Sequence, residues 1–224
     1  PGVLINSTLS AGPRPGTTDW QIRATPGARV DGVLQADNFG DAYTGEYRGS
    51  ASLGVNNPLW LGDRLDLRLL SSDKHQRYYR MAYQLPVSPW ATRAGVAHSY
   101  MNYRLGKDFS ELKAHGDATL SSAFLIQPLL RSRTLNVNAQ LQFDDKKLRD
   151  DIDLFESRSR KRISLWTASV DVNAQDRLFG GGQSVASLSY GIGNLHIEDP
   201  SARRLDGRTA KTEGQFSKLA LSAL

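Results

Sequence analysis

The clearest pattern in the sequence is an alternation of apolar and polar positions between Ala36 and Leu70, with a break at Asn57–Asp63. From Tyr47 to Val55 the odd-numbered residues are apolar or small, whereas the even-numbered residues are polar apart from one glycine. The same period of two returns at Leu65, Leu67 and Leu69, with charged residues between them. Successive side chains of a β-strand point to opposite faces of its sheet. The pattern therefore predicts strands with one apolar face and one charged face.

Segments of this kind follow one another along the whole chain. Two short candidates, Val3–Leu9 and Thr17–Thr25, flank a turn rich in Pro and Gly and predict a hairpin. The next ten predicted strands form one long series, in which only the fifth has no clear apolar face. They are Arg29–Asn38, Tyr47–Val55, Arg64–Leu69, Arg77–Leu85, Arg93–Tyr103, Gly116–Gln127, Leu135–Asp144, Trp166–Asn173, Ala186–Gly193 and a last strand from Gln215.

The sixth strand of the series, Gly116–Gln127, also predicts which residues share a face. We expect Ala118, Leu120, Phe124 and Ile126 to form its apolar face, because they fall at alternate positions.

The connections between the predicted strands alternate in length. Every second break is short and rich in Pro or Gly, and the breaks between them are polar and include the two longest, Asp145–Arg160 and His196–Gly214. Outer-membrane barrels have this up-and-down layout, with short turns at one end and longer loops at the other. A soluble β-sandwich is the alternative, but the many small residues on the apolar face favour the barrel. The short breaks are Asn57–Asp63, Pro86–Thr92, Pro128–Arg133 and Gln175–Gly182.

The most highly charged stretch runs from Asp144 to Arg162. We expect it to be a solvated external loop. An amphipathic helix through Leu148, Ile152 and Phe155 and a basic binding tract are the alternatives.

Composition excludes several classes of protein. The 224 residues include no cysteine, which excludes disulfide scaffolds, thiolate zinc clusters and thiol catalysis. No apolar run reaches eighteen residues, so no transmembrane helix is predicted, while barrel strands remain possible. The net charge is +5, but positive and negative residues are interspersed, so no nucleic-acid partner is expected.

No catalytic constellation is evident either. The four histidines lie in separate segments without the spacing of metal ligands, and no serine lies in a nucleophile elbow. We therefore expect no enzymatic activity, no metal and no cofactor.

Two motifs in the first third of the chain resemble a known family. The residues DNFGDAYTGEYR at Asp37–Arg48, followed by NPLWLGD at Asn57–Asp63, resemble the opening of the barrel in two-partner-secretion transporters of the haemolysin-activator type. Tyr79, Tyr83 and Pro86 are similar to the family's next strand. The start of the chain, with PGV and PGTTDW, resembles the last strands of a periplasmic POTRA domain.

The resemblance implies a fold and a division into domains. The fold is all-β, a transmembrane antiparallel up-and-down barrel of which this chain contributes about ten of roughly sixteen strands. Residues 1–26 would end a POTRA domain, and residues 27–224 would be the N-terminal part of the barrel. The chain begins without an initiator Met, so we expect it to be a segment of a longer protein.

The resemblance also implies a function. The family secretes a large partner exoprotein, such as a haemolysin, an adhesin or a contact-dependent toxin, which it recognises through the partner's N-terminal secretion domain. The expected place is the outer membrane of a Gram-negative bacterium, in contact with membrane lipids, with the N-terminal part in the periplasm and the protein a monomer. A barrel-assembly protein of the same superfamily and a passive porin are the alternatives.

Two sets of residues are candidates for a functional role. The first is the family motif, in which the Asp, Asn and Gly residues before Arg48 are expected to form a tight reversal with positive φ at glycine. A loop that contacts a partner is the alternative. The second set lies on the polar face of the strands, where it would form either a functional charged pore wall or merely a solvated interior. The motif residues are Asp37, Asn38, Gly40, Gly45, Arg48, Asn57, Pro58, Gly62 and Asp63, and the pore-lining candidates are Arg48, Arg64, Asp66, Arg68 and Arg80.

Overall fold

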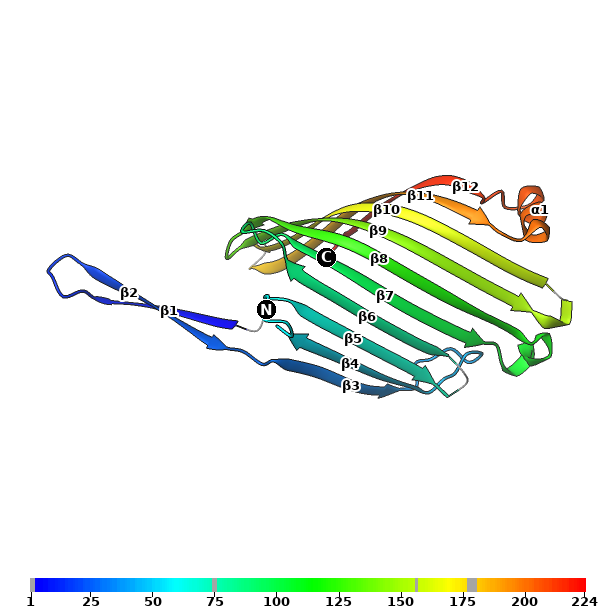
Figure 1. Ribbon diagram of the computed structural model, residues 1–224, viewed down its shortest axis with the longest axis horizontal. Coiled ribbons are helices and arrows are strands. Elements are labelled where there is room, and N and C mark those ends of the chain that lie inside the picture. The colour runs from blue at the N-terminus through cyan, green and yellow to red at the C-terminus, as the bar shows by residue number, and fades with distance from the viewer. Residues whose placement is uncertain (1–2, 74–75, 156, 177–180) are drawn as a thin grey trace.

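The computed structural model describes residues 3–73, 76–155, 157–176 and 181–224. Within these residues the chain forms a separate two-stranded sheet and a ten-stranded sheet. The two-stranded sheet is an antiparallel hairpin of β1 (Val3–Ala11) and β2 (Thr18–Pro26), as the sequence predicts. The hairpin projects beyond one end of the large sheet (Figure 1).

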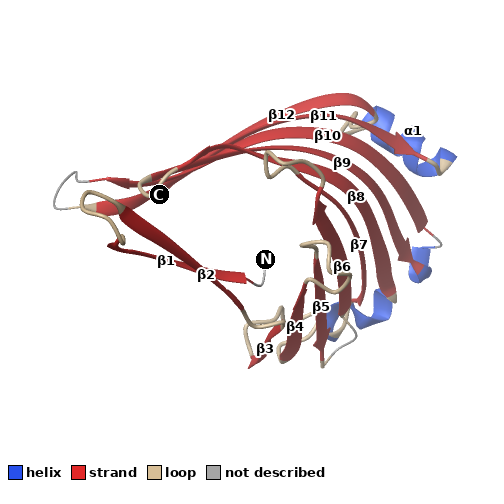
Figure 2. Ribbon diagram, turned by 60° about the vertical axis from the view of Figure 1, so that its left-hand side comes forward, coloured by secondary structure: helices blue, strands red, loops and turns tan. Residues whose placement is uncertain are grey.

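The large sheet is an uninterrupted antiparallel series in chain order, from β3 at one edge to β12 at the other. It curves strongly across its strands (Figure 2). The prediction of ten consecutive strands is therefore confirmed. The strands are β3 (Val30–Asp37), β4 (Arg48–Asn56), β5 (Arg64–Ser72), β6 (Arg77–Pro86), β7 (Arg93–Arg104), β8 (Ala114–Arg131), β9 (Leu135–Ile152), β10 (Ser157–Asp176), β11 (Gly182–Ile197) and β12 (Gly214–Ala223).

The two ends of the sheet carry different connections. At the end near the hairpin the turns are short, at residues 57–63, 87–92 and 132–134. The predicted break at Gln175–Gly182 falls partly on residues outside those described. The opposite end, which we call the loop end, carries the 3₁₀ turns η1 (Lys107–Leu112) and η2 (Asp153–Phe155) and the helix α1 (Pro200–Arg208). The helix lies within the polar break predicted at His196–Gly214.

The two faces of the large sheet differ in burial. Polar or small side chains on one face, including Asn56, Ser99, Ser122 and Asp144, are buried. Side chains crowd on the concave side of a curved sheet, so we call this the inward face. The other, outward face presents large exposed apolar residues on nearly every strand. They include Leu53, Leu69, Tyr79, Met81, Val96, Leu125, Leu141, Trp166, Val170, Leu188, Tyr190, Ile192, Leu219 and Leu221.

This exposed apolar band fits a sheet that spans a membrane. A soluble sheet buries its apolar face in a core, whereas lipid is the solvent for the outward face of a membrane barrel. The buried hydrophobic side chains of the described residues are few and comprise only Ala97, Ala114 and Ile197.

The predicted face assignment of β8 is wrong. Register places Ser122 between Ala97 of β7 and Asp144 of β9, both on the inward face. The even-numbered residues Ala118, Leu120, Phe124 and Ile126, expected on the apolar face, therefore point inward, and Leu125 points outward. The physical reason is local packing: a Cβ atom on Gly95 would collide with the ring of Phe124, so this ring covers a bare glycine on the neighbouring strand.

The predicted external loop at Asp144–Arg162 is also wrong. Strand β9 continues to Ile152 and β10 begins at Ser157, with paired residues throughout. The apolar alternation on the outward face of β9 stops after Phe143, but the backbone pairing does not. Beyond the apolar band neither face contacts the hydrocarbon of the membrane. Both faces can therefore carry charged residues, and the alternation that predicts a strand is lost.

The inverted register of β8 makes a prediction about membrane stability. Leu125→Arg puts a charge on the lipid-facing side, which should lower the free energy of unfolding in lipid by about 2 kcal/mol. Phe124→Arg places the same charge on the polar inward face and should cost clearly less. Urea titration of the full-length protein in lipid vesicles measures both values. A larger loss for Phe124→Arg than for Leu125→Arg would contradict the register.

Candidate functional site

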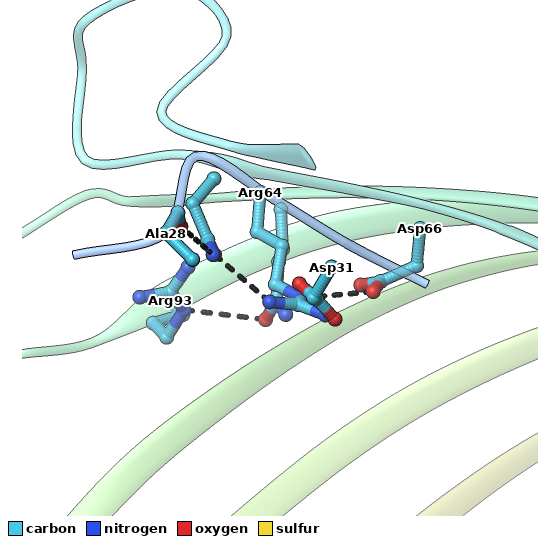
Figure 3. Close-up of polar contacts among 7 residues, drawn as sticks. Ala28, Asp31, Arg64, Asp66 and Arg93 are labelled. Carbon is cyan, nitrogen blue, oxygen red and sulfur yellow. Dashed lines mark hydrogen bonds and ion pairs between the residues drawn. The ribbon is translucent and has the colours of Figure 1, made fainter. Parts of the chain in front are cut away.

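The inward face of β3 to β7 carries a group of polar contacts with Arg64 near its centre (Figure 3). The Arg64 guanidinium donates hydrogen bonds to Asn56 Oδ1 at 2.8 Å, to Asp66 Oδ1 at 2.8 Å and to Asp31 Oδ1 at 3.1 Å. These partners come from strands β3, β4 and β5, which the antiparallel register brings side by side. One arginine therefore ties three neighbouring strands together on the inward face.

Asn56 extends this network toward the start of β3, and a separate polar pair lies on β6 and β7. Asn56 donates from Nδ2 to the Ala28 carbonyl oxygen at 3.0 Å, just before β3 begins. On β7, Arg93 donates from Nε to Gln84 Oε1 at 3.2 Å, while its Nη2 is buried without a partner among the described residues. Polar contacts thus follow the inward face from β3 across to β7.

Arg68 and Arg80 occupy directly opposite positions on β5 and β6. Within the described part of the chain neither arginine forms an ion pair with a carboxylate. Like charges placed opposite each other repel, and water on this face would screen the repulsion. Together with Arg64 and Asp66, both arginines line a hollow of about 230 Å³.

The charge on this part of the wall is unbalanced. Five arginines face inward on β3 to β7 against three aspartates, which leaves an excess of positive charge. The arginines are Arg48, Arg64, Arg68, Arg80 and Arg93, and the aspartates are Asp31, Asp37 and Asp66.

The motif at Asn57–Asp63 forms the turn between β4 and β5. Asn57 adopts a left-handed φ of 56° and Gly62 one of 72°, and Asn57 Oδ1 accepts the Gly62 N–H at 2.8 Å. Asp63 is fully buried and accepts hydrogen bonds from the backbone N–H groups of Leu59 and Leu61 and from the Tyr83 hydroxyl at 2.8 Å. The carboxylate thus holds the turn closed and fastens it to β6.

The surroundings of Asp63 act on its pKa in opposite directions. Burial raises the pKa, but the hydrogen bonds from Tyr83 and from the backbone N–H groups of Leu59 and Leu61 stabilise the carboxylate more strongly. The net effect lowers the pKa below the ordinary 3.8. Asp63 therefore remains ionised throughout the neutral range.

The motif at Asp37–Arg48 lies at the loop end. Arg48 donates from Nε and Nη2 to Asp37 Oδ1 at 2.9 and 2.8 Å, which closes the connection between β3 and β4. The connection spans residues 38–47, so the predicted tight reversal is wrong. Gly45 has the expected positive φ, at 126°. Gly40 does not, and its constraint is close approach, because a Cβ atom there would collide with the Gly45 carbonyl oxygen.

The structure thus separates the predicted site residues into three places. Asp37, Gly40, Gly45 and Arg48 lie at the loop end with Asn38, and the four residues Asn57, Pro58, Gly62 and Asp63 lie at the opposite end. The other pore-lining candidates, Arg64, Asp66, Arg68 and Arg80, lie between them on the inward face. Sequence reasoning assigned no role to four further residues that form these polar contacts. The four are Asp31, Asn56, Gln84 and Arg93.

The described residues hold no cluster of three or more His, Cys, Asp or Glu side chains that could bind a metal ion. Within the same part of the chain, none of the helices has the length and apolar character needed to cross a membrane.

Comparisons with known proteins point to one family. The family model described as haemolysin secretion/activation protein ShlB/FhaC/HecB matches residues 16–224. The heme/hemopexin transporter protein HuxB of Haemophilus influenzae strain Rd is 31% identical over 218 residues, which cover 97% of this chain and 38% of HuxB. HuxB of strain 86-028NP is 31% identical over 87% of this chain and 34% of its own length. The chain thus spans little more than a third of these curated relatives.

Solved structures share the fold. CdiB from Escherichia coli superposes with a TM-score of 0.73 and 20% sequence identity, over 98% of this chain and 41% of CdiB. CdiB from Acinetobacter baumannii superposes with a TM-score of 0.58 and 21% identity, over 88% of this chain and 38% of that structure.

The buried carboxylate of Asp63 makes the stability of the protein depend on pH. Because its folded pKa lies below that of the unfolded chain, the unfolded state takes up the proton first as pH falls. The contribution of Asp63 is therefore complete above about pH 5 and is lost as pH falls through 3.8 and below.

Asp63→Asn should lower stability at neutral pH and flatten this acid-dependent loss. Thermal unfolding of the full-length protein between pH 3 and pH 7 measures the effect, with Asp108→Asn, an exposed position in η1, as the matched control. An unchanged pH profile in Asp63→Asn would contradict the role given to this carboxylate.

Proposed function

Because the chain belongs to the family of haemolysin secretion/activation proteins ShlB/FhaC/HecB, we propose that it forms part of a pore that exports one large partner protein by two-partner secretion. Its ten-stranded sheet is part of a transmembrane β-barrel of the Gram-negative outer membrane. The observation that carries the proposal is the charged inward wall around Arg64, which keeps the interior of a lipid-embedded sheet wet. An extended polypeptide needs hydrogen-bonding partners of this kind along its path.

The proposed partner is a secreted exoprotein of the haemolysin, adhesin or contact-dependent toxin type, recognised through its N-terminal secretion domain. The name of the relative HuxB, a heme/hemopexin transporter protein, supports a transport role. The turn motif at Asn57–Asp63 and the loop motif at Asp37–Arg48 would hold the two ends of the first strands in place. The wall residues Arg48, Arg64, Asp66, Arg68 and Arg80 would contact water and the passing chain.

We further propose that the hairpin of β1 and β2 ends a POTRA domain at residues 1–26, on the periplasmic side, and that residues 27–224 belong to the barrel. The hairpin projects from the end of the sheet with short turns, the end that faces the periplasm in outer-membrane barrels (Figure 1). The loop end then faces the cell exterior. The protein would act as a monomer in contact with membrane lipids, without a catalytic step, a cofactor or a nucleic-acid partner.

Export can be tested directly in cells. The full-length protein is produced with the candidate exoprotein in a host without its own exporter of this type, and the exoprotein in the medium is quantified. We expect secretion only when both proteins are present. A porin would instead increase uptake of small solutes without secretion, and a barrel-assembly protein would change the amounts of other outer-membrane proteins.

The excess positive charge of the wall predicts ion selectivity. Replacing both Arg68 and Arg80 with serine removes two inward positive charges, and should raise the ratio of cation to anion permeability about twofold. Planar-bilayer recordings of the full-length protein under a salt gradient measure this ratio. Arg77→Ser combined with Arg104→Ser is the matched control, because both residues lie on the outward face of neighbouring strands.

The same variants separate a functional wall from a merely solvated interior. We expect the Arg68 and Arg80 double variant to secrete less exoprotein while inserting normally, as judged by heat-modifiable migration in gels. If conductance, selectivity and secretion are all unchanged, these arginines only keep the interior hydrated.

A further inference from the structure

The outward face of β9 and β10 carries two cross-strand pairs of like charge near the loop end. Lys147 lies opposite Arg162, and Arg149 lies opposite Arg160. All four side chains are exposed. Like charges directly opposite each other destabilise a sheet, so these two pairs lower the stability of the fold. Arg158 is the next residue of β10 on the same face. Together these five residues form what we call the outward basic cluster.

Two members of the cluster form ion pairs with acidic neighbours. Arg162 pairs with Asp145 at 2.8 Å, and Arg149 pairs with Asp151 at 2.7 Å. Among the described residues, the side chains of Lys147, Arg158 and Arg160 form no ion pair. Further acidic groups lie beside the cluster: Asp117 opposite Arg149, Asp151 opposite Arg158, Glu198 after β11, and Asp199, whose Oδ2 accepts the Arg160 backbone N–H at 2.6 Å. His196 lies opposite Arg162.

The outward basic cluster lies just beyond the end of the apolar band. The rings of Phe143 and Trp166, a cross-strand pair with centroids 4.9 Å apart, end the band on these strands. Lys147 follows Phe143 by four residues, which is about 14 Å along a strand and about 10 Å in height for a strand tilted by roughly 40°. Aromatic residues mark the interface of membrane barrels, so the cluster lies at the height of the lipid headgroups.

An apolar groove continues below the aromatic pair on the same strands. It has a volume of about 420 Å³ and is lined by residues that include Leu125, Leu141, Val170 and Tyr190. Leu141 and Tyr190 both lie opposite or beside Ala168, in the cross-strand row next to that of Phe143 and Trp166. Positive groups, an aromatic boundary and an apolar groove thus follow one another down a single outward surface.

We propose that this surface binds a phosphorylated glycolipid of the outer leaflet, with its phosphates on the outward basic cluster and an acyl chain in the groove. Guanidinium groups bind phosphate with two parallel hydrogen bonds, and a lysine supplies a mobile point charge. A bound phosphate also relieves the repulsion between Lys147 and Arg162 and between Arg149 and Arg160. The proposal requires the loop end to face the cell exterior, as in the proposed function, but it does not require export of any partner.

The decisive variant combines Lys147→Glu with Arg160→Glu. Each replacement places a carboxylate opposite an arginine, so strand pairing should be kept or strengthened while two positive charges of the cluster become negative. The matched control combines Lys146→Glu with Lys161→Glu, which makes the same change in charge on the inward face of the same strands. Native mass spectrometry of the full-length protein in detergent, titrated with bisphosphorylated lipid A, measures binding.

We expect the unmodified protein and the inward control to bind this lipid alike, and the outward variant to bind it at least about tenfold more weakly. Lipid A without its phosphates should bind all three proteins equally weakly. Equal binding of bisphosphorylated lipid A by the outward variant, or equal binding of dephosphorylated lipid by the unmodified protein, would overturn the proposal. If the outward variant does not insert, Lys147→Gln with Arg160→Gln provides the same comparison.

A secretion assay on the same variants distinguishes a failure of the lipid site from a failure of the proposed export function. Reduced lipid binding with normal secretion supports the lipid site alone. Lipid binding that depends on the cluster, in a protein that exports nothing, supports the lipid site and contradicts the export function.

Discussion

Main-chain pairing between consecutive strands is the constraint on which the rest of this structure depends. Lipid offers no water to unpaired N–H and C=O groups, so a membrane-spanning sheet must satisfy them between its own strands. Among the described residues the pairing runs from β3 to β12, with one irregularity between Pro128 and Leu130. Because a slip of one residue exchanges the two faces of a strand, this register also decides whether each charge meets water or lipid.

Alternation alone predicted most of the strands, because lipid on one side and water on the other enforce a period of two. Alternation failed for β8, because both its even-numbered and its odd-numbered residues include apolar side chains. Only pairing with the neighbouring strands shows which set points inward. Phe124 packs inward over Gly95, and Leu125 points outward. Alternation also failed where the strands leave the apolar band. There Asp145 and Lys147 on the outward face resemble a loop, although the backbone is paired.

The polar network shows a second limit of sequence reasoning. Arg64 and Asp66 are two positions apart, so their place on one face of a strand could be predicted, and their contact at 2.8 Å follows from it. The contact of Arg64 with Asp31 joins residues 33 positions apart and depends on the pairing of three strands. The buried position of Asp63 likewise depends on Tyr83 of a later strand. The motif residues could be recognised, but their partners could not.

The unequal lengths of the strands have a mechanical consequence for the barrel. Strand β9 has 18 residues and β4 has 9, and β8, β10 and β11 are also long. The nine additional residues of β9 extend it by roughly 30 Å in the strand direction. The loop end of the described sheet is therefore uneven, because β8 to β11 extend beyond the ends of β3 to β6. In the proposed export function, a polypeptide leaving the pore would meet a tall paired wall along β8 to β11 and a lower wall along β3 to β6, so its path would lean toward the lower side.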